Sequence, residues 1–195
     1  HLRPTSDRVR ESLFNILAGG SFGDVLEDAV VLDLFAGTGA LGLEALSRGA
    51  ASATFVDDGR KAGQLIRENT AKARVQDITR LIRRDARRLG PCEVRPATLV
   101  FLDPPYGKGM GATALATARE GGWLAPGALI VWEEREEQAA PEGTVKLDAR
   151  RYGDSWLTFL KISALEGSTG LCPADPRGLR PRMRICRKDE GQGDR

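Results

Sequence analysis

The chain has 195 residues, of which 41% are hydrophobic and 29% charged, and its formal net charge is +2. This composition is typical of one globular domain whose core needs no disulfide or metal support, and we find no apolar run of membrane-spanning length and no secretory signal. The single histidine, His1, argues against Ser-His-Asp triads and histidine-ligated metal sites. Three widely spaced cysteines, Cys92, Cys172 and Cys186, are interpreted as reduced. We therefore expect a cytoplasmic protein with no membrane attachment and no bound metal.

The first half of the chain alternates between helix and strand. Hydrophobic spacing predicts an amphipathic helix over residues 7–17 and a buried strand over residues 30–35. A helix over 41–46, a strand over 53–56 and a helix over 60–73 follow. Such alternation predicts an α/β fold with a mostly parallel sheet.

The second half first continues this alternation and then departs from it. It has four more predicted elements: a strand around 81–82, a strand over 99–102, a helix over 112–119 and a strand over 128–132. We therefore expect helices on both faces of the sheet. Two strands, over 144–150 and 156–162, then flank the turn-like residues 152–154, which predicts a C-terminal antiparallel hairpin.

The end of the chain differs in composition from the rest. Residues 167–195 are rich in glycine, proline and arginine and have few apolar side chains, so we expect a disordered tail there. Residues 1–166 then form a single domain. Basic residues also gather between residues 60 and 88, in a pattern that suits either a phosphate backbone or a solvated helix face.

A glycine-rich loop follows the first predicted strand. Residues 37–42, Gly-Thr-Gly-Ala-Leu-Gly, match G-x-G-x-x-G between a strand and a helix, and Asp57 follows twenty positions beyond Gly37. Such glycines let the backbone approach a ligand, and an acid at that distance can bind ribose hydroxyls, so the pattern predicts a nucleoside-containing cofactor. Asp33 favours S-adenosylmethionine over a dinucleotide, because a carboxylate attracts the ammonium and sulfonium groups and repels a pyrophosphate. The alternative is that Asp33 caps the glycine loop.

Asp85 and Ala86 follow the third predicted strand. The carboxylate of Asp85 is placed to accept a hydrogen bond from an adenine amino group. The alternative is a surface ion pair with Arg83 or Arg87.

The stretch over residues 99–106, LVFLDPPY, joins a buried strand to a proline loop. The prolines end the strand because proline has no N–H for the ladder. Asp103 and the carbonyl of Pro104 can each accept a hydrogen bond from an exocyclic amine, and the ring of Tyr106 can stack on a flat heterocycle. The stretch therefore predicts a socket for a nucleobase amino group. A rigid strand-to-loop turn is the alternative.

Four segments of the chain carry a family resemblance. They are RPTSDRVR at residues 3–10, VLDLFAGTGALG at 31–42, FVD at 55–57 and FLDPPY at 101–106. Together they resemble the RsmD family of bacterial ribosomal RNA methyltransferases, which methylate the N2 amino group of a guanine in small-subunit RNA. The resemblance covers residues 2–162 and implies a Rossmann-like class I methyltransferase fold that uses S-adenosylmethionine.

The resemblance also implies roles for single residues. The cofactor-binding residues would be Asp33, Phe35, Gly37, Gly39, Asp57, Asp85 and Ala86. The target guanine would be held by the catalytic group Asp103, Pro104 and Tyr106. RNA contact would come from Arg3, Thr5, Arg8 and Arg10. The partner would be ribosomal RNA or a small-subunit assembly particle, bound by a monomer.

The chain departs from the family pattern in two places. It starts almost at the Arg-Pro-Thr segment, so we expect an N-terminal part of the RNA-binding surface to be missing. Asp57 also stands where the family more often has glutamate.

Three other functions share part of this pattern. A DNA methyltransferase acting on adenine N6 or cytosine N4 would use the same Asp-Pro-Pro-Tyr socket. A nicotinamide-dependent oxidoreductase would explain the glycine loop but would leave Asp33 and Asp103 without a role. A catalytically silent RNA-binding module would have no use for Asp103 and Tyr106.

Overall fold

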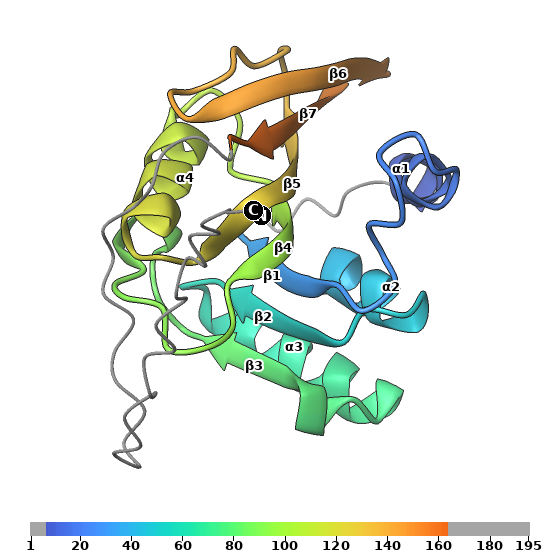
Figure 1. The fold of residues 1–195 in the computed structure, drawn as a ribbon. Helices are drawn as coiled ribbons and strands as arrows, with labels where there is room; N and C mark the ends of the chain where they lie inside the picture. The colour runs from blue at the N-terminus through green and yellow to red at the C-terminus, as the bar shows by residue number, and fades with distance from the viewer. Residues whose placement is uncertain (1–6, 164–195) are drawn as a thin grey trace, which may run out of the picture.

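The computed structural model describes residues 7–163, which form a seven-stranded sheet flanked by helices (Figure 1). The strands are β1 (Val30–Leu34), β2 (Ser52–Val56), β3 (Thr79–Ile82), β4 (Ala97–Leu102), β5 (Leu124–Glu134), β6 (Thr144–Tyr152) and β7 (Ser155–Ile162). The helices are α1 (Asp7–Ala18), α2 (Ala40–Ser47), α3 (Arg60–Ala73) and α4 (Met110–Glu120), with the 3-10 turns η1 (Gln76–Ile78) and η2 (Ala86–Arg88). The predicted tail over 167–195 and the predicted RNA-contacting residues Arg3 and Thr5 lie outside the described residues.

The sheet has the strand order β3-β2-β1-β4-β5-β7-β6. The first five strands pair in parallel, whereas β7 pairs antiparallel with both β5 and β6. The mostly parallel sheet and the C-terminal hairpin predicted from the sequence are therefore confirmed. Strands β1 and β4 lie side by side at the point where the strand order reverses, and ligands of open α/β sheets bind beyond the carboxyl ends of the strands at such a point.

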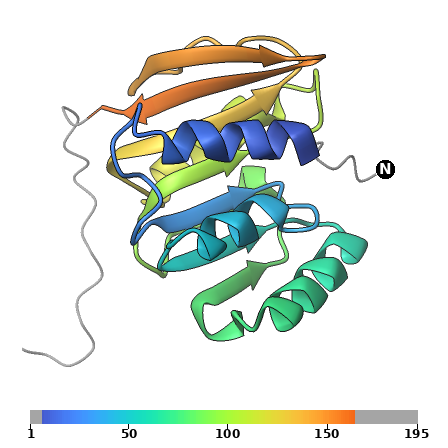
Figure 2. The same cartoon turned by 90° about the vertical axis from the view of Figure 1, so that its right-hand side faces the viewer.

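Helices cover both faces of the sheet, as predicted. Helices α1, α2 and α3 lie on one face (Figure 2), where Phe14 of α1 packs against Phe101 of β4 with ring centroids 5.8 Å apart. On the other face, Leu115 of α4 shares a buried cluster with Val100 and Leu102 of β4. Strand β4 is thus buried from both sides, which explains its unbroken apolar sequence. Within residues 7–163, no helix combines the length and the apolar character needed to cross a membrane.

Strand β5 is longer than the hydrophobic pattern predicts. It begins before the predicted range of 128–132, in a stretch that includes Pro126, and its pairing with β4 is irregular there because proline has no N–H for the ladder. It also continues past Trp132 through Glu133 and Glu134, both of which are buried. A prediction based on apolar residues ends the strand at the first charged side chain, so it misses the last two residues of β5. The extension brings Glu133 to the carboxyl end of the sheet.

Candidate active site

A cavity of about 520 Å³ lies at the carboxyl ends of β1, β2, β4 and β5. The predicted site residues that line it are Arg10, Asp33, Phe35, Gly37, Asp57, Asp85, Ala86, Asp103, Pro104 and Tyr106. Gly39 and Arg8 are not among its lining residues. One cavity therefore brings together the glycine loop, the acids that follow three strands, and the Asp-Pro-Pro-Tyr loop.

The first two glycines of the loop, Gly37 and Gly39, lie in different surroundings. Gly37 and Gly39 have φ angles of 58° and 78°, in the left-handed region that favours glycine. A Cβ on Gly39 would lie 3.2 Å from the ring of Phe55, so this glycine packs closely against the buried side of the loop. Gly37 faces the cavity instead. The loop is also tied to α3, because Asn69 Nδ2 donates a hydrogen bond of 2.9 Å to the carbonyl of Thr38.

Asp57, at the end of β2, ties two loops together through its carboxylate. Its Oδ2 accepts the N–H of Gly37 at 2.9 Å, and its Oδ1 accepts the N–H of Gly59 at 2.8 Å. A carboxylate has about four acceptor sites, so these two bonds leave capacity for a pair of ligand hydroxyls. Asp57 can therefore fix the glycine loop and hold a ribose at the same time.

Asp33 lines the cavity and is buried, with only 1% of the residue exposed. Its Oδ2 accepts the N–H of Gly42 at 3.0 Å, which is the capping role that the sequence left open. Burial raises the pKa of Asp33 well above 3.8, the charges of Asp103 and Asp57 raise it further, and the bond from Gly42 offsets part of the rise. A cationic ligand in the cavity would favour the charged form of this carboxylate. Capping and cation binding are compatible.

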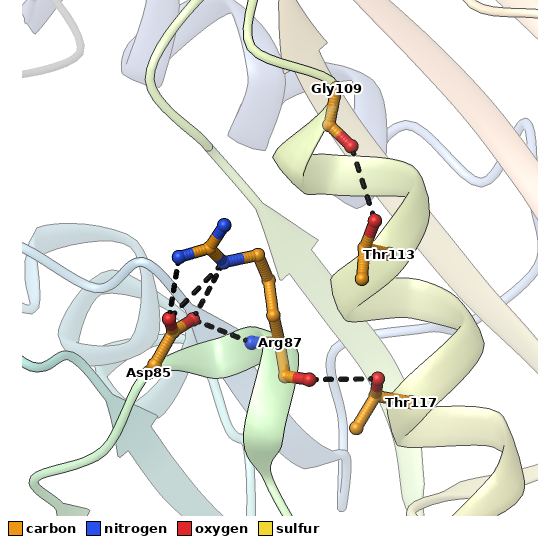
Figure 3. A network of polar contacts seen from close by, with 5 residues as sticks. All are labelled: Asp85, Arg87, Gly109, Thr113 and Thr117. Carbon is orange, nitrogen blue, oxygen red and sulfur yellow. Dashed lines mark hydrogen bonds and ion pairs between the residues drawn. The ribbon is translucent and has the colours of Figure 1, made fainter.

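Asp85 caps the 3-10 turn η2 and is paired with Arg87 (Figure 3). Its Oδ1 accepts the backbone N–H of Arg87 at 2.9 Å, and its Oδ2 lies 2.7 Å from Nη2 of the same residue. The hydrogen bond to the Arg87 side chain lowers the pKa of Asp85. The carbonyl of Arg87 in turn accepts a hydrogen bond from Thr117 of α4. The ion pair proposed as the alternative is thus present, while Asp85 and Ala86 also line the cavity.

Tyr106 is held by its hydroxyl group. The hydroxyl donates to Glu133 Oε1 at 3.1 Å and lies 2.7 Å from Ser155 Oγ, so β5 and β7 both fix the ring. The guanidinium of Arg135 lies over the ring at 5.7 Å from its centroid. Burial, followed by the charges of Glu133 and Asp103, raises the pKa of Tyr106 to about 12. The side chain is therefore neutral at physiological pH and can act as a stacking surface.

Glu133 and Ser155 are cavity residues that the sequence analysis did not predict. Glu133 belongs to an acidic segment that follows an apolar run, and the local pattern assigns it to solvent. A usable signal is that its strand ends next to the strand that carries Asp103, because the carboxyl ends of parallel strands share one edge of the sheet. The hairpin turn adds residues 152–154 to the same wall.

The N-terminal helix α1 forms one side of the cavity. Arg10 lines it and pairs with Asp7 at 3.0 Å, and Val9 lies beside it. Arg8 is exposed and lies outside the cavity lining. Of the four predicted RNA-contacting residues, the structure thus places Arg10 at the cavity, and Arg3 and Thr5 lie outside the described residues.

Several known proteins are similar to this chain in sequence. A family model described as "Conserved hypothetical protein 95" matches residues 1–161. The ribosomal RNA small subunit methyltransferase D of Escherichia coli (strain K12) is 42% identical over 140 residues, which cover 72% of this chain and 68% of that protein. The protein of the same name from Haemophilus influenzae is 33% identical over 157 residues, which cover 78% of this chain and 79% of that protein.

Solved structures give the fold class. The structure of an RNA methyltransferase from Salinibacter ruber in complex with S-adenosyl-L-homocysteine matches with a TM-score of 0.63 at 19% identity, covering 89% of this chain and 98% of that one. The fold is thus the Rossmann-like fold of class I methyltransferases. The family model and the two relatives above assign the chain to the RsmD family of ribosomal RNA small subunit methyltransferases.

Proposed function

We propose that this chain transfers a methyl group from S-adenosylmethionine to the exocyclic N2 amine of a guanine in small-subunit ribosomal RNA. The observation that carries the proposal is that the glycine loop and the Asp-Pro-Pro-Tyr loop open into one cavity. Methyl transfer needs both ligands side by side, and orientation within a shared cavity is a large part of what an enzyme contributes to such a reaction. The names of the two relatives favour ribosomal RNA as the substrate.

The cofactor half of the cavity fits a cationic nucleoside. S-Adenosylmethionine supplies an electrophilic methyl group on a positively charged sulfur. Asp33 and Gly37 would hold its methionine part, Asp57 its ribose, and Asp85 with Ala86 its adenine. The carboxylate of Asp33, in β1, attracts such a cation, and it would repel the pyrophosphate of a nicotinamide dinucleotide. This charge pattern counts against the oxidoreductase alternative.

The other half of the cavity fits a flat base with an amino group. Asp103 and the Pro104 carbonyl would accept the two N–H groups of the amine, while the neutral ring of Tyr106 stacks on the base. An exocyclic amine is a poor nucleophile because its lone pair is delocalised into the ring. Asp103 would therefore act by stabilising the positive charge that develops on the nitrogen as the methyl group leaves the sulfur and bonds to the nitrogen. S-Adenosylhomocysteine is released, and the nitrogen then loses one proton to give the neutral product. Holding the target amine for methyl transfer is useful only in an enzyme. The presence of Asp103 and Tyr106 therefore counts against the alternative of a catalytically silent RNA-binding module.

Stacking on Tyr106 requires the target base to leave its neighbours in the RNA. This is less costly in a loop or an unpaired segment than inside a duplex, so we expect the target to be unpaired when it binds. Arg10 lines the cavity and would contact the RNA backbone next to the extruded base.

The direct test is transfer of labelled methyl from S-adenosylmethionine to small-subunit ribosomal RNA, offered both naked and as assembly particles, followed by nucleoside analysis. N2-methylguanine in RNA, with no label in a DNA control, is the expected result. Label in DNA adenine or cytosine would favour the DNA methyltransferase alternative, because Asp103 and the Pro104 carbonyl can accept hydrogen bonds from those amines as well.

A further inference from the structure

We propose that Glu133 is a third hydrogen-bond acceptor of the base socket, beside Asp103 and the Pro104 carbonyl, and that it binds the N1–H of the target guanine and so selects guanine over other bases that carry an amine. The inference rests on the proposed function and adds to it the residue that determines the choice of base.

The register between β4 and β5 places Glu133 next to the socket. Leu102 of β4 pairs in parallel with Trp132 of β5, so Asp103, just beyond the end of β4, and Glu133, still within β5, lie side by side. Neighbouring strands are about 4.8 Å apart. Both side chains line the same cavity, and the charges of both carboxylates raise the pKa of Tyr106. Glu133 therefore lies next to the residue that would accept the target amine.

The carboxylate of Glu133 is buried and oriented. Its residue is only 6% exposed, and Oε1 accepts the hydroxyl of Tyr106 at 3.1 Å. Burial of a carboxylate is costly unless donors compensate it, and such positions in a cavity are candidates for ligand binding. A carboxylate offers about four acceptor sites, so its contact with Tyr106 is compatible with a further donor from a ligand.

An acceptor beside Asp103 distinguishes guanine from adenine and cytosine. In guanine, the ring nitrogen N1 next to the amine carries a hydrogen, so this edge presents donors in a row. In adenine and cytosine, the ring nitrogen next to the amine is unprotonated and is itself an acceptor. A carboxylate can only accept hydrogen bonds, so that of Glu133 binds the guanine edge and repels the lone pair of the other two bases. A site built in this way rejects the wrong partner strongly because its buried polar group is left unpaired.

The test uses 2-aminopurine, which keeps the 2-amine of guanine but has an unprotonated N1. After the methylated nucleotide has been identified, small-subunit particles are prepared with guanine or 2-aminopurine at that position. The wild-type enzyme is expected to prefer guanine by about ten- to a hundredfold in kcat/KM, the usual effect of one hydrogen bond to a charged group. The Glu133→Gln variant, whose amide can turn its NH2 group toward N1, is expected to lose most of this preference.

Two controls separate the choice of base from other effects of Glu133. Glu134→Gln changes the next residue of β5, also buried, whose carboxylate accepts the N–H of Gly107 at 3.2 Å, and it should keep the preference for guanine. Tyr106→Phe removes the hydroxyl that Glu133 accepts and should lower turnover of both bases without changing their ratio. A role of Glu133 that acted only through Tyr106 would give the same result in Tyr106→Phe and Glu133→Gln.

The outcomes separate the inference from the proposed function. A Glu133→Gln enzyme with the wild-type ratio, or a wild-type enzyme that uses both bases equally, would overturn the inference and leave Asp103 and Pro104 as the acceptors of the socket. The comparison of the two bases with the wild-type enzyme needs no variant, so it tests the inference even if Glu133→Gln folds poorly. A wild-type enzyme that methylates no RNA base, or a base other than guanine, would overturn the proposed function itself.

Discussion

The two halves of the cavity are held together in different ways. In the cofactor half, the carboxylates of Asp33 and Asp57 accept backbone N–H groups of glycines that lie no more than 20 positions away in the chain. In the base half, Tyr106 is fixed by the side chains of Glu133 and Ser155, which lie 27 and 49 positions away. The cofactor half is therefore built from local backbone geometry, and the base half depends on the docking of β5 and β7. Substitutions in one half should leave the other half nearly unchanged.

The largest effect is expected from Asp103→Ala, in the base half. The substitution removes an acceptor aimed at the developing charge, so methyl transfer should fall by roughly a hundred- to a thousandfold. Donor binding, measured by isothermal titration calorimetry, should change by less than about threefold, because Asp103 does not hold the glycine loop. Full turnover in Asp103→Ala would show that the socket is not the site of reaction.

Asp57→Ala should give the opposite pattern, in the cofactor half. It removes the acceptor of two backbone N–H groups and of the ribose hydroxyls, so donor affinity should fall by about ten- to a hundredfold. At saturating donor, turnover should recover most of its wild-type value. Asp77→Ala, an exposed carboxylate outside the cavity, is the matched control. Equal losses of affinity in both variants would contradict the role given to Asp57.

The buried charge of Asp33 links stability and donor binding to pH. Because its pKa in the folded protein is raised above 3.8, the folded state holds an extra proton just above that pH, and stability falls as pH rises through the raised pKa. Asp33→Asn should therefore stabilise the unliganded protein at neutral pH by about 0.5–2 kcal/mol, as measured by urea unfolding. It should also weaken donor binding by roughly tenfold or more.

The same substitution gives a pH signature for binding. Wild-type affinity for S-adenosylmethionine should fall as pH drops through the raised pKa of Asp33, because the protonated side chain no longer attracts a cation. The affinity of Asp33→Asn should not follow this profile. S-Adenosylhomocysteine, which lacks the sulfonium charge, is the ligand control and should show a weaker dependence. Identical profiles for both proteins would assign Asp33 to capping alone.

The smallest effect is expected from Ser155→Ala, which removes one neutral contact to Tyr106. Such a hydrogen bond contributes about 0.5–1.5 kcal/mol, so turnover should fall by roughly two- to tenfold. The effect should vanish in a Tyr106→Phe background, where the hydroxyl is absent, and this double-mutant cycle is the measurement that checks it. Additive losses would mean that Ser155 acts elsewhere.

Most of the fold could be predicted from the sequence. The alternation of helix and strand, the glycine loop and the C-terminal hairpin follow from local hydrophobic period and from glycine and proline positions, which act over a few residues. The bounds of β5 could not be predicted, because Pro126 and the pair Glu133 and Glu134 are unfavourable in an isolated strand. The two glutamates are held in the strand by pairing with β7.

The candidate site, too, could be predicted only in part from the sequence. The sequence by itself determined which groups end the parallel strands, including Asp57 and Asp103, because a strand signal and the polar residue after it are neighbours in the chain. The tertiary structure decided which partners these groups meet: Glu133 and Ser155 at Tyr106, and Arg10 of α1 at the cavity. The register between parallel strands and the position of α1 on the sheet depend on packing between segments that are far apart in the sequence. A local sequence pattern therefore cannot predict them.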